Sequence, residues 1–357
     1  MARSLFFILY LSDGVKKRPC KMCQWNPTLA QRSRKDGAPR RLEHQRHLRY
    51  TSASNLNREM TVVTLRQPAF DSSPITVRKA RAEDAPVCGR ICYEAFTRIS
   101  TEHGFPPDFP SVEVATGVLS MMFSHPGFYC VVAESGGQIL GSNCLDERSA
   151  IAGVGPITID PEVQNKGVGR ALMEAVLARS AQRGFQGARL LQAAFHNRSL
   201  SLYTKLGFDT REPISTMQGP AIKASTPGYS VRPARLSDLE ECNRLCRRVH
   251  GHDRSGELCD AIEQGTAVVA ERDGRIVAYS TSIGFFGHTV GESNADVQAL
   301  IANADVFLGP GILVPTRNAG LFRWCLENGL RVVQPMTLMT LGFYNEPAGA
   351  WLPSILY

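Results

Sequence analysis

The sequence of 357 residues has no apolar run near the roughly 20 residues needed to cross a bilayer. Its most apolar short stretch, residues 5–11, follows Arg3, but no small-x-small cleavage pattern comes after it, so we expect no secretion signal. The expected location is therefore the cytoplasm, with no membrane partner. The ten cysteines are expected to be reduced, because the chain is not a short secreted scaffold.

Most of the sequence also lacks an excess of positive charge. Residues 1–59 hold 13 Lys/Arg and 4 Asp/Glu, whereas the remainder holds 27 and 29. Residues 1–73 show little apolar periodicity and are predicted to be a basic, disordered tail. Met60 would make a natural start, so we expect residues 1–59 to be dispensable. We expect no nucleic acid to bind the folded part. Binding of DNA through the tail stays open, and deletion of residues 1–59 would test it.

No group of side chains has the spacing of a metal site. The C-x-x-C motif in the tail needs a second pair of zinc ligands, and the nearby candidates are two histidines. A second possible set lies in the C-terminal half, but its spacing matches no zinc pattern. We therefore expect no bound metal. The residues of the two sets are Cys20, Cys23, His44 and His47, and Cys246, His250, His252 and Cys259.

From residue 75 onward, periodic apolar segments alternate between the strand and helix types. Gly, Pro and Asn residues separate the segments, and a hairpin turn is predicted at residues 135–137. The predicted strands cover residues 75–78, 128–133, 138–143, 151–159, 188–194 and 209–217. The predicted helices begin at residues 83, 112, 170 and 199.

The pattern then repeats. Residues 231–235 match residues 77–81 at an offset of 154, and Val-Val-Ala-Glu at 268–271 matches 131–134. We therefore expect an α/β protein with two tandem domains, at residues 74–224 and 229–357, each a mixed twisted sheet flanked by helices. The second copy lacks the glycine motif described next; its nearest stretch is residues 315–320.

The glycine motif is Gln164-Asn165-Lys166-Gly167-Val168-Gly169, which lies between the strand at 157–159 and a helix. Free N–H groups at a helix start favour a phosphate, and Lys166 and Arg170 add positive charge. A dinucleotide fingerprint needs a third glycine, but position 172 is Leu. A Walker loop needs Gly-Lys-Ser/Thr, which is missing here.

A second motif follows downstream: Asn197 precedes a helix that ends in Tyr-x-x-x-Gly-Phe, at Tyr203, Gly207 and Phe208. Together, the two motifs resemble those of the GNAT acetyltransferase superfamily, over residues 75 to about 220. The second half resembles a degenerate GNAT module. The resemblance implies direct transfer of an acetyl group from acetyl-CoA to an amine in a ternary complex. The acceptor would be a small molecule or a protein or peptide.

The resemblance also implies roles for particular residues. Backbone N–H groups around the glycine motif would hold the CoA pyrophosphate, residues 157–159 would pair with the pantetheine and polarise the thioester carbonyl, and Tyr203 would be the general acid. Packing of Tyr203 on an apolar helix face is the alternative, and Asn197 could cap its helix. The implied acetyl-CoA-binding residues are Ile157, Thr158, Ile159, Gln164, Asn165, Lys166, Gly167, Val168, Gly169, Arg170, Asn197 and Tyr203.

The general base is the least determined residue. The family often places an acid on the strand before the loop, but residues 155–159 contain none. Asp146 and Glu147 are the tentative candidates, followed by His103 and Glu102, with ordinary solvated charges as the alternative. The Pro-rich segment 101–110 is expected to form an acceptor-site wall, and the second domain to shape that site or to form a homodimer surface. A non-catalytic acyl-CoA sensor is the alternative function, and it would have no need of Tyr203.

Overall fold

The computed structural model describes residues 74–357. The predicted tail, its C-x-x-C motif and the possible start at Met60 lie outside the described residues. Among the helices of residues 74–357, none combines the length and the apolar character needed to span a membrane.

The N-terminal half contains the helices and strands expected from the sequence. Pro86 stands in the first turn of α1, where its missing N–H costs no helical hydrogen bond, and the Ser111 hydroxyl caps α2. The elements are β1 (Thr76–Lys79), α1 (Ala85–Glu102), α2 (Val112–Ser124), β2 (Phe128–Ser135), β3 (Gln138–Asp146), β4 (Ala152–Val154), β5 (Thr158–Ile159), α3 (Val168–Arg183), β6 (Gly187–Ala193), α4 (Asn197–Lys205) and β7 (Asp209–Gln218). Short 3-10 turns, Ala82–Asp84 and Pro161–Val163, precede α1 and α3.

One predicted strand differs from the structure. The sequence predicts a single strand over residues 151–159, but the structure has two short strands, β4 and β5. Gly155 has a φ of 138°, which L-residues rarely adopt, and Pro156 has no N–H to donate to a neighbouring strand. These two residues therefore end β4, and the chain leaves the direction of the first strand.

The C-terminal half repeats the order of elements. They are β8 (Ser230–Pro233), a 3-10 turn (Leu236–Asp238), α5 (Leu239–His250), α6 (Ser255–Glu263), β9 (Val268–Arg272), β10 (Arg275–Ser280), β11 (Thr289–Gly291), α7 (Asn294–Asn303), β12 (Ile312–Pro315), α8 (Ala319–Glu327), β13 (Arg331–Gly342) and β14 (Ala350–Leu352). In this order, residues 315–320 join β12 to α8 and correspond to the turn between β6 and α4. The equivalent of the glycine motif is the β11–α7 turn, so the comparison of 315–320 with that motif is wrong.

An arginine in the first strand of each half makes the same ion pairs. The guanidinium group of Arg78 donates to Asp84 at 2.7 Å and to Glu134 at 2.8 Å. Arg232 donates to Asp238 at 2.7 Å, and its Nε donates to Glu271 at 3.0 Å. Each arginine thus ties the first strand to the start of the first helix and to the hairpin, which supports the internal repeat.

Replacing Arg78 by Gln should lower the free energy of unfolding by about 2 kcal/mol at pH 7, because the buried Asp84 carboxylate loses its cation. The hydrogen bonds from Arg78 hold the pKa of Asp84 below its ordinary value of 3.8. The stabilisation is therefore complete above about pH 4 and is lost as the pH falls through the lowered pKa. Urea unfolding of both proteins at pH 7 and pH 3 measures the difference.

Arg90→Gln is the matched control, because Arg90 makes an exposed ion pair with Glu94, four residues along the same helix. Its effect should stay within about 0.5 kcal/mol. Equal unfolding free energies for Arg78→Gln and Arg90→Gln would contradict the role of the buried network.

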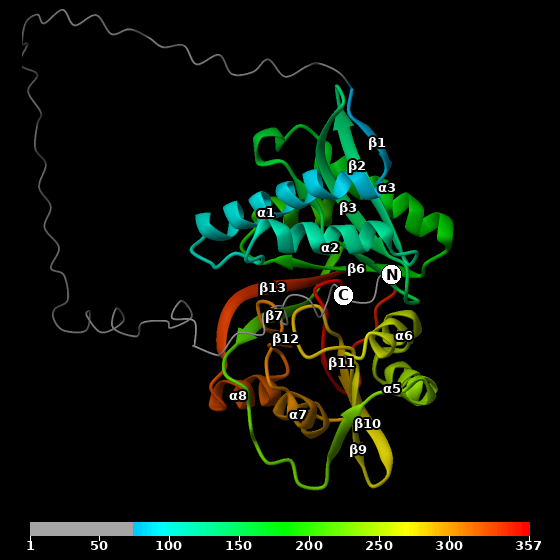
Figure 1. Cartoon of the computed structure of the whole chain (residues 1–357), viewed down its shortest axis with the longest axis vertical. Helices are drawn as coiled ribbons and strands as arrows, with labels where there is room; N and C mark the ends of the chain where they lie inside the picture. Colours follow the sequence, from blue (N-terminus) through cyan, green and yellow to red (C-terminus); the bar gives the residue numbers. More distant parts are fainter. Residues whose placement is uncertain (1–73) are drawn as a thin grey trace, which may run out of the picture. The chain divides into compact units, whose positions relative to one another are not determined.

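The two halves exchange their last long strands. The larger sheet has nine strands in the order β1-β2-β3-β4-β6-β13-β7-β12, with β5 paired to β3. Strand β13 pairs antiparallel with β6, with Met336 opposite Ala193, and on its other edge with β7, with Leu338 opposite Glu212. Strand β7 pairs in turn with β12 of the C-terminal half. Figure 1 shows β13 in red running between elements of the two halves.

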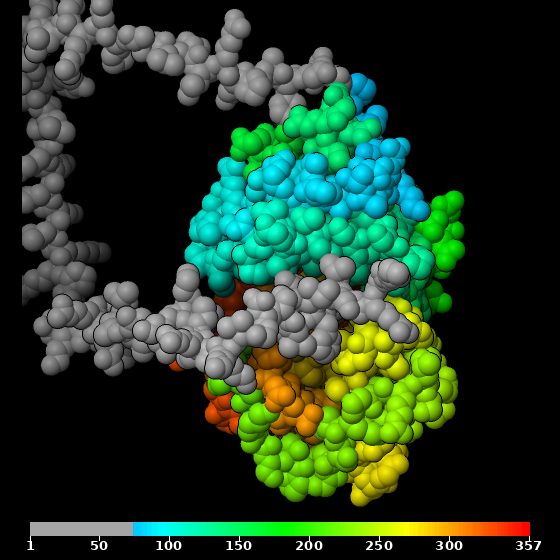
Figure 2. All heavy atoms as spheres, in the orientation of Figure 1, coloured from blue at the N-terminus to red at the C-terminus, as the bar shows by residue number. Residues whose placement is uncertain are grey.

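Helices cover both faces of the larger sheet, as the alternation of residues along β2 requires. Cys130 and Val132 pack with α1 and α2, whereas Val131 and Ala133 pack on the opposite face with α3. Figures 1 and 2 show α1 and α2 side by side over the near face of this sheet. The candidate functional site lies where the sheet opens beneath α1.

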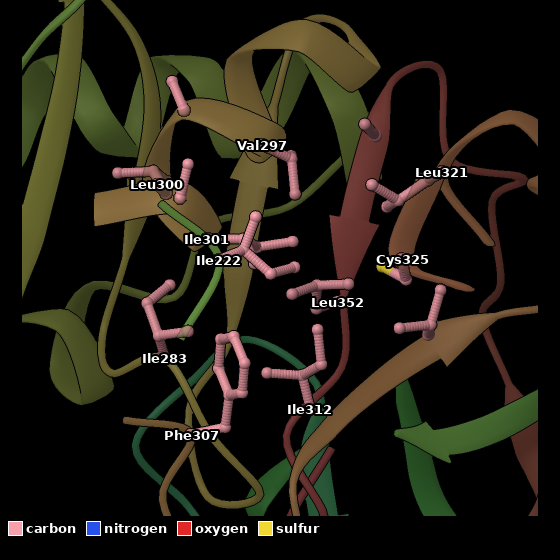
Figure 3. Close-up of a cluster of buried hydrophobic side chains, with 14 of the residues drawn as sticks. Ile222, Ile283, Val297, Leu300, Ile301, Phe307, Ile312, Leu321, Cys325 and Leu352 are labelled. Atoms are coloured by element: carbon pink, nitrogen blue, oxygen red, sulfur yellow. The ribbon is translucent and has the colours of Figure 1, made fainter. Parts of the chain in front are cut away.

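The smaller sheet has the order β14-β11-β10-β9-β8. Its main core lies between this sheet, strands β7 and β12, and two helices: Val297 and Leu300 come from α7, Leu321 from α8, Ile312 from β12 and Leu352 from β14 (Figure 3). Strand β14 is thus part of the core of the C-terminal half, and it occupies a position with no counterpart in the N-terminal half.

Candidate functional site

The larger sheet opens between β5 and β6. Strand β4 pairs with β6 at two positions, Ala152 with Ala188 and Gly153 with Arg189. After the break at Gly155-Pro156, β5 pairs with β3 and with no second strand of the described chain. One edge of β5 therefore faces an opening, and its backbone groups are available to a ligand that lies along it.

A cavity of about 960 Å³ fills this opening. Its lining comes from α1, the α1–α2 loop, the β4–β5 segment, the start of α3, the end of β6 and α4. The structure thus brings together most of the residues that the sequence predicted to bind a ligand. Those that line the cavity are Ile157, Thr158, Ile159, Gln164, Asn165, Gly167, Val168, Gly169, Arg170, Asn197 and Tyr203. Lys166, which was also predicted, is not one of the lining residues.

The glycine motif forms the turn that starts α3. Gly167 is the residue before the helix and has a φ of 87°, and Asn165 also has a positive φ, of 69°. Gly169 has little room for a side chain, because a Cβ there would lie 3.2 Å from the Ile159 Cδ1 atom. The first N–H groups of α3 have no carbonyl partner within the helix and no side-chain cap. The turn is therefore shaped to receive an anion at the helix start.

Within the described part of the chain, four cationic side chains line the same cavity. Arg170 pairs with Glu174 across an exposed turn at 3.2 Å, and Arg98 pairs with Glu102 at 3.0 Å and with Glu162 at 3.1 Å. Such exposed pairs are weak and exchange readily for a stronger anion. The four cations are Arg98, Arg170, Arg198 and Lys205.

Tyr203 lies on α4 and faces the cavity, with 7% of its surface exposed. Its ring packs near that of Phe208, and no side chain of the described residues hydrogen-bonds its hydroxyl. Burial raises the pKa of Tyr203 above its ordinary value of 10, so the phenol stays protonated at neutral pH. A protonated hydroxyl at the wall of a cavity, with no partner among residues 74–357, is available to donate a proton to a ligand.

Asn197 is the first residue of α4, and His196 occupies the cap position before it. The predicted capping role of Asn197 is therefore not seen, whereas its place on the cavity wall is. His196 also lines the cavity and was not predicted from the sequence. Burial and the nearby Arg198 lower the pKa of His196 to about 4, so its imidazole is neutral at pH 7.

The tentative general bases at the end of β3, Asp146 and Glu147, lie outside the cavity lining. Asp146 accepts hydrogen bonds of 2.9 and 2.6 Å from the Arg148 guanidinium group. Glu147 accepts hydrogen bonds of 2.7 and 3.0 Å from Arg179. Neither carboxylate lines the cavity, so the geometry gives no support to either as the base. Both are neutralised by arginines, which the sequence pattern could not show.

The two further candidates for the general base, Glu102 and His103, are in the α1–α2 region. Glu102 lines the cavity and is paired with Arg98. His103 is not a lining residue; its ring lies 5.3 Å from that of Phe195. The expected acceptor wall at residues 101–110 is represented by Glu102, Asp108 and Phe109. Asp108 was not singled out from the sequence, although it lies in this predicted segment.

The C-terminal half also contributes to this cavity, through Phe285, Phe286, Met336, Ile355 and Leu356. Met336 comes from the exchanged strand β13, and the other four come from connections near β10, β11 and β14. The sequence could suggest that the second half shapes the site, but it gave no signal for these residues, because their position depends on the exchange of strands.

The corresponding opening in the C-terminal half is closed. Strand β14 pairs with β11, with Trp351 opposite Val290. At the start of α7, the Ser293 N–H and hydroxyl both donate to Asp296, at 2.7 and 2.6 Å, so the helix start is capped by its own residues. Within residues 74–357, the arrangement of an open strand edge and an uncapped helix start is therefore found in the N-terminal half.

Comparison with known proteins finds similar sequences and folds. The family model of the acetyltransferase (GNAT) domain matches residues 126–210. A putative acetyltransferase from Pyrococcus horikoshii is similar in structure, with a TM-score of 0.61 and 16% identity, over 77% of this chain and 94% of that one. A GCN5-related N-acetyltransferase from Sphaerobacter thermophilus has a TM-score of 0.52 and 14% identity, over 76% and 96%. No curated protein sequence matches the chain significantly. The two structures share the fold over both halves of the chain.

Proposed function

Because the chain contains a GNAT acetyltransferase domain, we propose that it is an acetyl-CoA-dependent N-acetyltransferase that transfers an acetyl group directly to an amine. One observation carries the proposal: the open edge of β5, the uncapped start of α3 and the Tyr203 hydroxyl meet in one cavity.

The proposed domain limits, 74–224 and 229–357, are supported by the segment without helix or strand between β7 and β8.

The cavity suits acetyl-CoA in its shape and its charges. The N–H groups at the start of α3 would bind the pyrophosphate, with Arg170, Arg198 and Lys205 as countercharges. The open edge of β5 would pair with the pantetheine amides in the manner of an added strand. Gly167 provides the positive φ that the turn requires, and Gly169 has no side chain between the backbone and Ile159. The backbone of the turn is therefore accessible to the ligand.

The thioester supplies an activated acetyl group, and the chemistry left to the protein is orientation and proton transfer. A backbone N–H of residues 157–159 would stabilise negative charge on the carbonyl oxygen as the amine attacks. Tyr203 would give its proton to the departing sulfur, since burial keeps its hydroxyl protonated at neutral pH. No cysteine lines the cavity in the described part of the chain, which favours direct transfer over a thioester-linked enzyme.

Two measurements test the proposal. The first is the affinity for CoA by calorimetry, and the second is the release of CoA thiol from acetyl-CoA across a panel of small amines and peptide N-termini. The wild type should bind CoA and release thiol with at least one amine. Gly169→Leu should lose both, because the new side chain fills the space beside Ile159 and Leu202.

The alternative function, an acyl-CoA sensor, predicts a different pair of results. A sensor would bind CoA as tightly as an enzyme, and Gly169→Leu would still abolish that binding. It would release no thiol with any amine, whether or not Tyr203 were present. Tight binding without turnover throughout the panel would therefore overturn the proposed activity.

A further inference from the structure

Asp108 lies in the α1–α2 loop, on the wall of the cavity that also contains Pro156, Ile157 and Tyr203. Among residues 74–357, two carboxylates line this cavity, Glu102 and Asp108. The Glu102 carboxylate is half exposed and paired with Arg98. Asp108 makes no ion pair with any cation in residues 74–357; instead, the side-chain amide of Gln334 donates a hydrogen bond of 2.8 Å to its Oδ1. Asp108 is therefore the lining carboxylate whose charge is not balanced by the protein.

Several apolar side chains line the same cavity as Asp108. The rings of Phe96 and Phe109 lie 5.9 Å apart on the same wall. The C-terminal half adds Phe285, Met336 and Leu356, and the first two are almost fully buried. Burial raises the pKa of Asp108 above its ordinary value of 3.8. A carboxylate that is costly to ionise without a partner favours a ligand that brings a positive charge.

We propose that Asp108 binds the acceptor amine and is the general base of the reaction, and that the acceptor is a small amine carried on an aromatic or aliphatic body. The proposal rests on the proposed acetyl transfer. Asp108 recognises the ammonium group, and the surrounding Phe, Met and Leu side chains bury the body of the acceptor.

The acceptor nitrogen loses two protons during the reaction. The acceptor ammonium gives one proton to the Asp108 carboxylate, which returns it to solvent after the reaction. The neutral nitrogen then attacks the thioester carbon, so that a C–N bond forms and the C–S bond breaks. The departing sulfur takes the proton of Tyr203, and the second proton of the nitrogen replaces it. The products are the amide and the CoA thiol.

Gln334 is a positioning residue for this base. It lies on the exchanged strand β13, is 1% exposed, and its hydrogen bond to Asp108 favours the ionised carboxylate. The exchange of strands thus connects the C-terminal half to the reaction. Loss of this hydrogen bond should raise the pKa of Asp108 without removing the base.

Glu102, His196 and Tyr203 are other titratable groups on the cavity wall. Glu102 is paired with Arg98, and the His196 pKa is lowered to about 4. Tyr203 stays protonated beyond neutral pH. The acidic limb of the rate profile is the decrease in kcat/KM at low pH. If this limb is lost when Asp108 is replaced but is kept when another group is replaced, it reports the protonation of Asp108.

The test compares Asp108→Asn with the matched control Glu102→Gln, using 2-phenylethylamine and spermidine as acceptors. Asn keeps the shape of Asp108 and can still accept the hydrogen bond of Gln334. We expect Asp108→Asn to lower kcat/KM for 2-phenylethylamine at least 100-fold, to lose the acidic limb, and to keep the wild-type Kd for CoA and the wild-type Tm. Glu102→Gln should keep the acidic limb. Gln334→Leu should shift that limb to higher pH.

The wild type should use 2-phenylethylamine at least tenfold better than spermidine, because each methylene segment of spermidine lies between charged nitrogens that would have to be buried with it. If Asp108→Asn kept the wild-type kcat/KM and acidic limb, Asp108 would not be the base. If spermidine or a peptide N-terminus were the better acceptor, the assignment of the acceptor class would be overturned. If the wild type bound CoA but acetylated no amine, the proposed function itself would fail, which distinguishes that failure from the first two.

Discussion

Replacing Tyr203 by Phe is expected to lower kcat about 100-fold or more, with little change in the Kd for CoA. The phenol is the buried, protonated donor on the cavity wall, and general acids contribute roughly 10²- to 10⁴-fold to rates. Its hydroxyl has no hydrogen-bond partner among the described side chains, so removing it should leave the fold unchanged. Steady-state kinetics with the best amine of the panel gives the measurement.

Tyr129→Phe is the matched control, because Tyr129 is a tyrosine of the same half that packs against Arg179 and does not line the cavity. It should keep the wild-type kcat. A Tyr203→Phe enzyme with wild-type kcat at every pH would show that the sulfur takes its proton from another source, such as water. In that case the packing of Tyr203 on α4, the alternative considered from the sequence, would be its main role.

Separating the two halves is expected to unfold the protein. Strand β13 lies between β6 and β7, and it carries Met336, Leu338 and Met339 into the core. Losing three such buried side chains costs about 2–5 kcal/mol each, which is comparable to the 5–15 kcal/mol by which a typical domain is stable. Residues 74–227 expressed alone should therefore show no cooperative unfolding transition, although the sequence predicts one domain at residues 74–224.

A protease site inserted between Pro227 and Gly228, in an exposed turn, tests this expectation in the full chain. After cleavage, the two fragments should elute together from a size-exclusion column and keep the circular dichroism of the uncut protein. They should separate when denaturant is added. Two fragments that elute apart, each with a native spectrum, would contradict the structural role of the strand exchange.

Much of the local structure could be predicted, because local patterns determine it. The hairpin of β2 and β3 follows from alternating apolar residues around Ser135-Gly136-Gly137, and the end of α4 follows from Gly207, which has a φ of 94°. The division of residues 151–159 into β4 and β5 was missed. Ile151 and Val154 before Gly155-Pro156, and the β-branched residues 157–159 after it, look like one strand. The change of partner strand is a tertiary effect.

The pairing of strands could not be predicted. The sequence of β13 has the alternation of a buried strand, but nothing in it indicates whether its neighbours belong to its own half or to the other. The contributions of Met336 and Gln334 to the site depend on that choice. For the same reason, the sequence could place the glycine motif and Tyr203, which lie in one half, better than it could place the base.

The general base is a second feature that the sequence could not predict. Asp146 and Glu147 follow the strand that precedes the motif, which made them reasonable candidates. Their pairing with Arg148 and Arg179 depends on side-chain geometry. Asp108 stood in a Pro-rich loop whose path cannot be derived from periodicity. Its isolation from cations is visible only once the cavity wall is assembled.

The central claim is direct transfer of acetyl from acetyl-CoA to an amine. The most direct test is to incubate the full chain with acetyl-CoA labelled with ¹³C in the acetyl group and with 2-phenylethylamine, and to analyse both the amine and the intact protein by mass spectrometry. We predict labelled N-acetyl-2-phenylethylamine, formed in step with CoA thiol, and a protein that carries no label at any time. A labelled protein, or acetyl-CoA that stays bound and intact with every amine in the panel, would contradict the proposed function.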